Sequence, residues 1–125
     1  MDSIKNLSPS VLAFVGDGVY GLLVREMLAK VNRPSGELHR LSVELVNANA
    51  QADAFKVIEN ALSDEELSVF KRGRNFHTGN VPKSSDAPSY HTATGLECLF
   101  VFLYLQKRYE RMYELFGKIT DGKCF

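Results

Sequence analysis

The chain has 125 residues, about the length of one globular domain, so no second domain of ordinary size fits within it. Hydrophobic residues make up 45% and charged residues 24% of the sequence, a balance that excludes a disordered chain. The net charge is zero, but residues 1–70 carry a charge of −4 and residues 71–125 a charge of +4, so a basic surface for an acidic partner is available in the second part.

The sequence contains no pattern of a secreted or membrane protein. No apolar signal-peptide region follows Met1, and the longest apolar run, residues 98–105, is shorter than the roughly 18 residues of a membrane span. Cys98 and Cys124 match neither a disulfide framework nor the spacing of metal ligands, so both are expected to be free thiols. We therefore expect a cytoplasmic protein without membrane contact.

Helical periodicity dominates the sequence and predicts an all-α fold, a helical bundle in a single domain. Ser8 as N-cap and Pro9 at the first helical position predict a helix that ends near Lys30. A second helix is expected from about residue 37 to residue 60.

Three further helices are expected along the rest of the chain. Ser63 and Glu66 have the spacing of a capping box for a helix that ends near Gly73. After a loop over residues 75–88, a helix over about residues 89–107 is apolar on most of its circumference and should be the core helix. A last helix, residues 108–119, closes the domain.

Asp17 lies between Gly16 and Gly18 in the middle of the first apolar helix. Each glycine costs about 1 kcal/mol relative to alanine there, which indicates that something approaches the backbone closely. A tight helix crossing without any functional role is the simpler interpretation. A carboxylate that is expected to be buried on this stretch favours a bound metal ion, because it needs a compensating cation or several donors.

Glu97 is a second acid in an apolar environment, between Leu96 and Cys98 on the predicted core helix. Two carboxylates without a His or Cys cluster are hard oxygen ligands that suit Mg²⁺ better than zinc. A structural ion pair with Lys or Arg is the alternative. Tyr90 and Thr94 precede Glu97 by seven and three residues, so both can share its face of the helix.

Four basic residues and no acid lie between residues 71 and 85, which predicts a cationic surface for phosphates: Lys71, Arg72, Arg74 and Lys83. Lys71 and Arg72 are also placed to complement the negative end of the third helix, which is the structural alternative.

The order and spacing of several motifs resemble Mini-ribonuclease III, the short bacterial branch of the ribonuclease III family, over essentially the whole chain. The matching segments are Ala13-Phe14-Val15-Gly16-Asp17, Val24-Arg25, Leu38-His39, Ser42, Val46, Ala48, Gln51-Ala52, Lys71-Arg72-Gly73-Arg74-Asn75, Pro82-Lys83, Tyr90, Thr94 and Glu97.

The resemblance implies a catalytic domain without a separate RNA-binding domain, acting as a homodimeric endoribonuclease on double-stranded RNA. Asp17 and Glu97 would be the catalytic carboxylates and the ligands of Mg²⁺, for which Mn²⁺ could substitute. The products would carry 5′-phosphate and 3′-hydroxyl ends. The natural substrate would be the precursor of 23S ribosomal RNA, with a ribosomal protein as a further partner.

The RNA-binding residues that the resemblance favours are Lys71, Arg72, Arg74, Asn75 and Lys83. The chain departs from full-length ribonuclease III at three positions, where acids near the metals are replaced by Ser10, Ala13 and Thr94. A catalytically inactive RNA-binding or assembly module is the alternative function, and the presence of both Asp17 and Glu97 argues against it. A purely structural helical protein would leave Asp17 unexplained.

Overall fold

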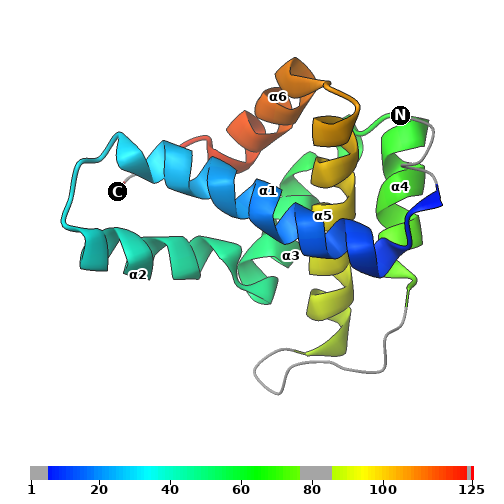
Figure 1. Cartoon of the computed structure of the whole chain (residues 1–125), viewed down its shortest axis with the longest axis horizontal. Coiled ribbons are helices and arrows are strands. Elements are labelled where there is room, and N and C mark those ends of the chain that lie inside the picture. Colours follow the sequence, from blue (N-terminus) through cyan, green and yellow to red (C-terminus); the bar gives the residue numbers. More distant parts are fainter. Residues whose placement is uncertain (1–5, 77–85, 124) are drawn as a thin grey trace.

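The computed structural model describes residues 6–76, 86–123 and 125. The described residues form six α-helices and one short 3₁₀ helix, without a strand, which confirms the all-α fold (Figure 1). In chain order the elements are α1 (Pro9–Ala29), α2 (Ser35–Val46), α3 (Ala48–Ile58), η2 (Glu59–Ala61), α4 (Asp64–Arg74), α5 (Ala87–Leu105) and α6 (Tyr109–Thr120).

The predicted starts of α1 and α4 are confirmed. The Ser8 hydroxyl accepts a hydrogen bond from the backbone N–H of Val11 at 3.3 Å, and Pro9 is the first residue of α1. At α4, Ser63 accepts from the Glu66 N–H, and the Glu66 side chain accepts from the Ser63 N–H. Both caps depend on residues within three positions of one another, so the local sequence is sufficient to specify them.

The single helix predicted over residues 37–60 is wrong, because the chain breaks at Asn47 into α2 and α3. Asn47 is extended, with φ −71° and ψ 161°, and its side-chain oxygen accepts from the N–H of Ala50 at 2.9 Å. Its amide group also donates to the carbonyl oxygens of Val43 and Glu44. The Asn47 side chain thus bonds to backbone groups at the end of α2 and at the start of α3. These bonds take the place of the backbone hydrogen bonds of a continuous helix.

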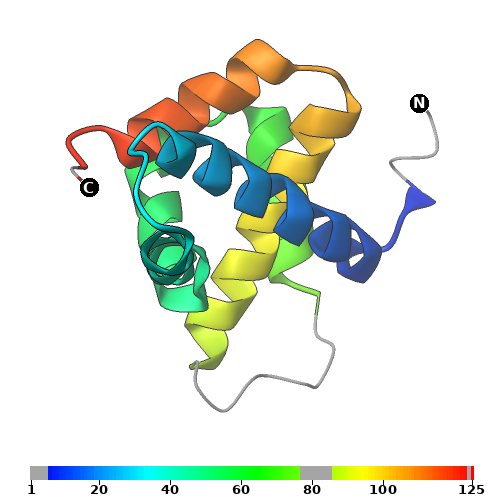
Figure 2. The same cartoon turned by 60° about the vertical axis from the view of Figure 1, so that its left-hand side comes forward.

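Helix α5 forms the centre of the molecule, as predicted for the core helix. Figures 1 and 2 show α5 running through the bundle with α1, α3 and α4 packed around it. Leu96, Leu99, Val101 and Leu103 of α5 are fully buried. Of the helices in the described part of the chain, none combines the length and apolar character that crossing a membrane requires.

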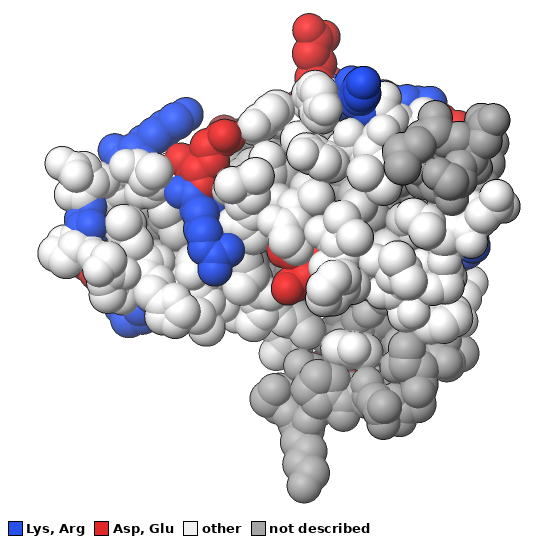
Figure 3. All heavy atoms as spheres, viewed as in Figure 1, with Lys and Arg blue, Asp and Glu red and all other residues white. Residues whose placement is uncertain are grey.

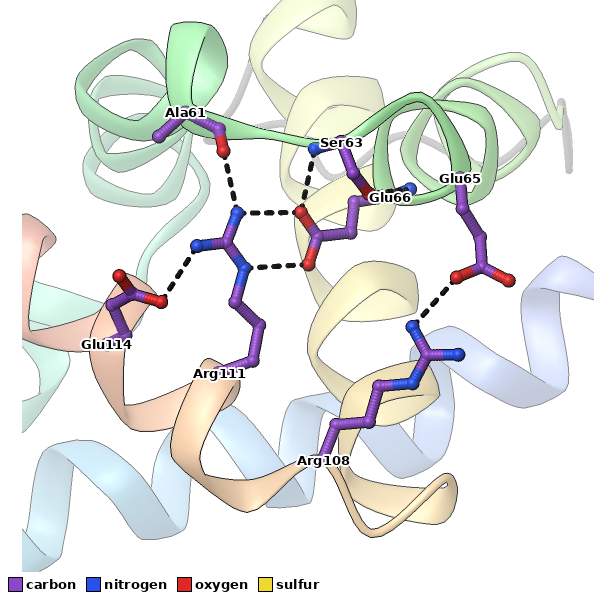
Figure 4. A network of polar contacts seen from close by, with 7 residues as sticks. All are labelled: Ala61, Ser63, Glu65, Glu66, Arg108, Arg111 and Glu114. Carbon is purple, nitrogen blue, oxygen red and sulfur yellow. Dashed lines mark hydrogen bonds and ion pairs between the residues drawn. The ribbon is translucent and has the colours of Figure 1, made fainter.

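An ionic clamp joins α6 to the start of α4 (Figure 4). The Arg111 guanidinium donates two hydrogen bonds to the Glu66 carboxylate, each of 2.8 Å, and further bonds to the Ala61 carbonyl oxygen and to Glu114. Glu66 is only 3% exposed, and its pKa is lowered mainly by the hydrogen bonds from Arg111. A bidentate pair of this kind restricts orientation as well as distance, so it fixes α4 against the rest of the bundle.

Candidate active site

The crossing of α1 and α5 places Asp17 beside Glu97. A Cβ atom built on Gly16 would lie 2.2 Å from the Glu97 carbonyl oxygen, so the two helix backbones touch at this point. Gly18 has open space around it instead. The tight-crossing interpretation is therefore correct for Gly16, and this crossing brings the two acids together.

Both predicted catalytic carboxylates line one pocket of about 290 Å³. Tyr90 and Thr94 line it as well, so their predicted position on the Glu97 face of α5 is confirmed. The three positions where acids of full-length ribonuclease III are replaced also belong to this pocket. Its complete lining is Ser10, Ala13, Phe14, Asp17, Phe76, Tyr90, Thr94 and Glu97.

The pocket holds two carboxyl groups that act on each other, without a basic side chain paired to either among the described residues. The pKa of Glu97 is raised from 4.5 to about 8, first by desolvation and then by the charge of Asp17 and a hydrogen bond between the two acids. Across residues 6–76 and 86–123, no Lys or Arg forms an ion pair with either acid. Among the residues that the structure describes, the ion-pair alternative for these two acids therefore has no basic partner.

The expectation that Asp17 is buried is wrong. Asp17 is exposed, whereas Glu97 is half-buried. The apolar neighbours of Asp17 in the sequence mislead because α1 turns only part of its circumference to the core, and Phe14 and Val15 are exposed as well. Exposure makes Asp17 accessible to ions and substrate from solvent.

The contact between the two acids predicts that the metal-free protein loses stability as pH rises. The folded-state pKa of Glu97 lies above its unfolded value, so folding favours the protonated acid, and this contribution is present below pH 4.5 and lost as pH rises through about 8. Glu97→Gln removes it. Both Tm values are measured in the presence of a chelator. We expect the difference in Tm, Glu97→Gln minus wild type, to be larger at pH 8 than at pH 5. Equal pH dependence of both proteins would contradict this prediction.

Gln51 of α3 also reaches the pair of acids, although sequence reasoning did not assign it to the site. Its side chain is 3% exposed, and its amide acts to lower the pKa of Glu97. The sequence feature that could have identified Gln51 is an amide side chain among the apolar residues of α3. Phe14 and Phe76 were missed as lining residues because aromatic residues are equally expected in a core.

The predicted RNA-binding residues that the structure describes lie at the end of α4, where their side chains make different contacts. Lys71 and Asn75 are exposed, while the Arg74 guanidinium lies over the Phe70 ring at 5.6 Å and donates to the Asn75 side chain at 3.1 Å. Lys83 lies outside the described residues. Phe76 joins this segment to the pocket of Asp17 and Glu97.

Arg72 points to a different part of the molecule. Its guanidinium donates to the Leu7 carbonyl oxygen at 3.1 Å and lines a second pocket with Pro9 and Cys98. Cys98 is buried and unpaired, as expected from the cysteine spacing, and burial raises its pKa to about 12. Arg72 thus ties α4 to the residues that precede α1.

Comparison with known proteins extends these observations. The family described as Ribonuclease III domain matches residues 10–108. Mini-ribonuclease 3 of Thermoanaerobacter sp. is 42% identical over 89% of this chain and 79% of its own length. Mini-ribonuclease 3 of Staphylococcus aureus is 35% identical over 93% of this chain and 89% of its own length.

A solved structure agrees with this relationship. The crystal structure of a protein from Fusobacterium nucleatum superposes with a TM-score of 0.88 at 29% identity and covers 98% of both chains. The matched family region includes Asp17 and Glu97 and the crossing between them. The chain therefore belongs to the ribonuclease III domain family and, as its sequence predicts, it is an endoribonuclease.

Proposed function

We propose that this chain hydrolyses double-stranded RNA with Mg²⁺ held by Asp17 and Glu97. The observation that carries the proposal is the contact of two carboxyl groups in an accessible pocket without a basic partner among the described residues. Such a pair attracts a divalent cation, because the ion neutralises both charges at once.

The residues of the pocket fit Mg²⁺ by their chemistry. Carboxylate oxygens are the ligands that this ion prefers, and one or two of them commonly suffice. No group of three or more potential His, Cys, Asp or Glu ligands occurs in the described part of the chain. Ser10, Ala13 and Thr94 leave room in the pocket, so water and phosphate oxygens would complete the coordination. Mn²⁺ has similar ligand preferences and should substitute.

When bound, the ion supplies a Lewis acid that acidifies water and stabilises charge on the phosphate. Asp17, which is accessible, would be the principal ligand. Glu97, half-buried and in contact with Asp17, would be the second ligand and orient the attacking water. That water would form a new bond to phosphorus and lose a proton to solvent, while the bond to the 3′ oxygen breaks and the 3′ oxygen takes up a proton from solvent. The products would be 5′-phosphate and 3′-hydroxyl ends.

Cleavage of a long RNA duplex tests the proposed function. We expect cutting in Mg²⁺ or Mn²⁺, none in a chelator, and products that a 5′-phosphate-dependent exonuclease degrades. A matched single-stranded RNA should remain intact. A folded protein that binds the duplex without cutting it would instead indicate the inactive RNA-binding module.

We further propose that exposed polar residues at the end of α4 bind the phosphates of the duplex. Lys71 and Asn75 are accessible there, and Phe76 connects this segment to the pocket. The sequence adds Arg72, Arg74 and Lys83 to this surface. Arg72 is exposed, and the hydrogen bonds of Arg72 with Leu7 and of Arg74 with Asn75 each use one of the five N–H donors of a guanidinium.

Replacing Lys71, Arg72, Arg74 and Lys83 by alanine is expected to weaken duplex binding and flatten its dependence on salt. Each phosphate contact contributes close to one unit to the slope of log affinity against log salt, so losing them reduces the slope. Fluorescence anisotropy at several salt concentrations measures this, with circular dichroism as the folding control. An unchanged slope in the folded variant would show that these residues do not contact the phosphates.

An apolar face of α1 supports the proposal that the protein acts as a homodimer. Val11, Phe14, Val15 and Leu22 are all exposed, with Phe14 at 81% and Leu22 at 59%. Their spacing, with Gly18 between them, places them on one side of the helix. Figure 3 shows uncharged atoms over the middle of α1 with a small acidic patch beside them, and both basic and acidic side chains toward the left-hand end of the helix. Two copies that pair around a twofold axis along this face would bury it.

Leu22→Glu is expected to convert the dimer to a monomer, because a charge would be buried in the paired face. Val57→Glu on α3 is the matched control, since Val57 is 58% exposed and lies on another helix. Analytical ultracentrifugation at micromolar concentration should find wild type and Val57→Glu as dimers. A monomeric wild type that still cuts both strands efficiently would refute the proposed dimer.

The proposed natural substrate is the precursor of 23S ribosomal RNA, at the stem where its ends pair. The support is the resemblance to Mini-ribonuclease 3 proteins, and a ribosomal protein would be a further partner. Mapping of the precursor ends in cells that lack the protein, followed by cleavage of the precursor in vitro, tests this substrate.

A further inference from the structure

Arg25 of α1 differs from every other arginine in the polar contacts of its side chain. All arginines of the sequence lie in the described part of the chain. The others each form an ion pair or a side-chain hydrogen bond: Arg33, Arg40, Arg72, Arg74, Arg108 and Arg111. Among the residues that the structure describes, Arg25 forms neither, although its side chain is exposed.

Neither of the usual structural roles of a helical arginine accounts for Arg25. A cation stabilises the C-terminal end of a helix only within its last turn, and the last turn of α1 contains no basic residue. Ion pairs along a helix join residues three or four positions apart, as Arg40 and Glu44 do on α2. At these distances from Arg25 the sequence has only leucine, glycine and alanine. The guanidinium is therefore available for a ligand.

The Arg25 guanidinium turns back along α1 toward the pocket of Asp17 and Glu97. A Cβ atom built on Gly21 would lie 2.9 Å from Nη1 of Arg25, so the guanidinium lies over Gly21, one turn before its own backbone. Asp17 precedes Gly21 by one further turn, which is about 6 Å along the helix axis. The cation thus lies close to the pair of acids, yet within the described residues it forms no ion pair with either of them.

Arg25 also lines a pocket of about 280 Å³ between α1 and α2, called here the α1–α2 pocket. Ser35 and His39 of α2 are exposed in it, and of the described residues no acid lines it. The segments Val24-Arg25 and Leu38-His39 are among those that resemble the family, but they do not contribute to the pocket of Asp17 and Glu97. A pocket that contains a cation and uncharged polar groups, without a lining acid, attracts an anion.

A phosphate of the RNA backbone is the anion that this position favours. The α1–α2 pocket follows the pocket of Asp17 and Glu97 along the same helix, so a duplex bound at the acids extends past it. Contacts to phosphates hold a nucleic acid in position, whereas they do not read its sequence. The planar guanidinium of arginine matches a phosphate with two parallel N–H donors. Figure 3 shows basic as well as acidic side chains on the left-hand part of the face that carries the small acidic patch.

We propose that Arg25 binds a backbone phosphate of the RNA duplex, on the α2 side of the pocket of Asp17 and Glu97. The α1–α2 pocket is then a second contact site for RNA, separate from the end of α4. This inference rests on the proposed function, in which the duplex lies across the two acids. Arg25 holds the substrate and takes no part in the hydrolysis.

Equilibrium binding of a short fluorescent RNA duplex to the full chain in a chelator tests the inference, because the duplex stays uncut. Arg25→Gln should weaken binding about tenfold and reduce the slope of log affinity against log salt by about one unit, since one phosphate contact is lost. Arg25→Lys keeps the charge and should keep the wild-type slope. Circular dichroism and thermal melting serve as folding controls, and the exposed position of Arg25 predicts wild-type melting for both variants.

Arg40→Gln is the matched control for the loss of one positive charge. Arg40 is an exposed arginine of α2 that pairs with Glu44 at 3.0 Å and does not line the α1–α2 pocket. This variant should bind the duplex within about twofold of wild type and with an unchanged salt slope, because a pair of this kind contributes little.

The outcomes separate this inference from the proposed function. If Arg25→Gln binds the duplex like Arg40→Gln, or binds weakly with the wild-type salt slope, Arg25 does not hold a phosphate and the inference is wrong. Cleavage by wild type in Mg²⁺ would still support the proposed function in that case. If wild type does not bind the duplex at all, the proposed function fails and the role of Arg25 fails with it.

Discussion

Replacing Asp17 by asparagine is expected to reduce duplex cleavage by about 10³-fold or more while duplex binding remains. The substitution keeps the volume of the side chain but removes the charge that attracts the ion, and the ion contributes several kcal/mol to the transition state. Glu97→Gln should behave in the same way, because a neutral amide is a poor ligand for a hard cation. Single-turnover cleavage beside fluorescence anisotropy measures both effects.

Thermal melting distinguishes this role from a structural one. Asp53→Asn is the matched control, since Asp53 is an exposed acid of α3 whose weak contact with Lys56 is remote from the pocket lining, and it should cut like wild type. In the metal-free protein, Asp17→Asn should melt no earlier than wild type, because it removes the repulsion that, after burial, raises the pKa of Glu97. A variant that melts early yet cuts at the wild-type rate per folded molecule would refute the metal assignment at that position.

Gly16→Ala is expected to lower the free energy of unfolding by about 3 kcal/mol or more. The added Cβ would lie 2.2 Å from a backbone carbonyl oxygen of α5, which no change of side-chain rotamer can relieve. The helices would have to separate, and with them Asp17 and Glu97. Cleavage per folded molecule should therefore fall together with stability. Urea unfolding and single-turnover cleavage measure the two quantities.

Gly117→Ala provides the control for this effect. Gly117 lies inside α6 and has open space around the position of its missing Cβ, so alanine should raise the free energy of unfolding by about 1 kcal/mol. Opposite signs of the two changes in the free energy of unfolding would show that the effect of Gly16→Ala comes from the helix crossing and not from helix propensity. A stable and active Gly16→Ala variant would show that the crossing of α1 and α5 does not position the acids.

Much of the fold and part of the candidate site could be predicted from the sequence because the relevant interactions are local or carried by motifs. The caps at Ser8 and Ser63 join residues three positions apart, and α5 is apolar around most of its surface. Asp17 and Glu97 were recognised as acids on apolar helices and as parts of family motifs. Their assignment as metal ligands and that of the α4 residues as RNA contacts remain proposals.

By itself, then, the sequence determined the helical class, most helix starts, the core helix and the family. Only the structure showed the break at Asn47, the exposure of Asp17, the contact of Arg72 with Leu7 and the meeting of Asp17 with Glu97. The break at Asn47 is made by local hydrogen bonds of its side chain. The others depend on which face of a helix meets another element. Caps and apolar periodicity specify where a helix forms, whereas only the packing of α1, α3 and α4 against α5 specifies which side chains meet.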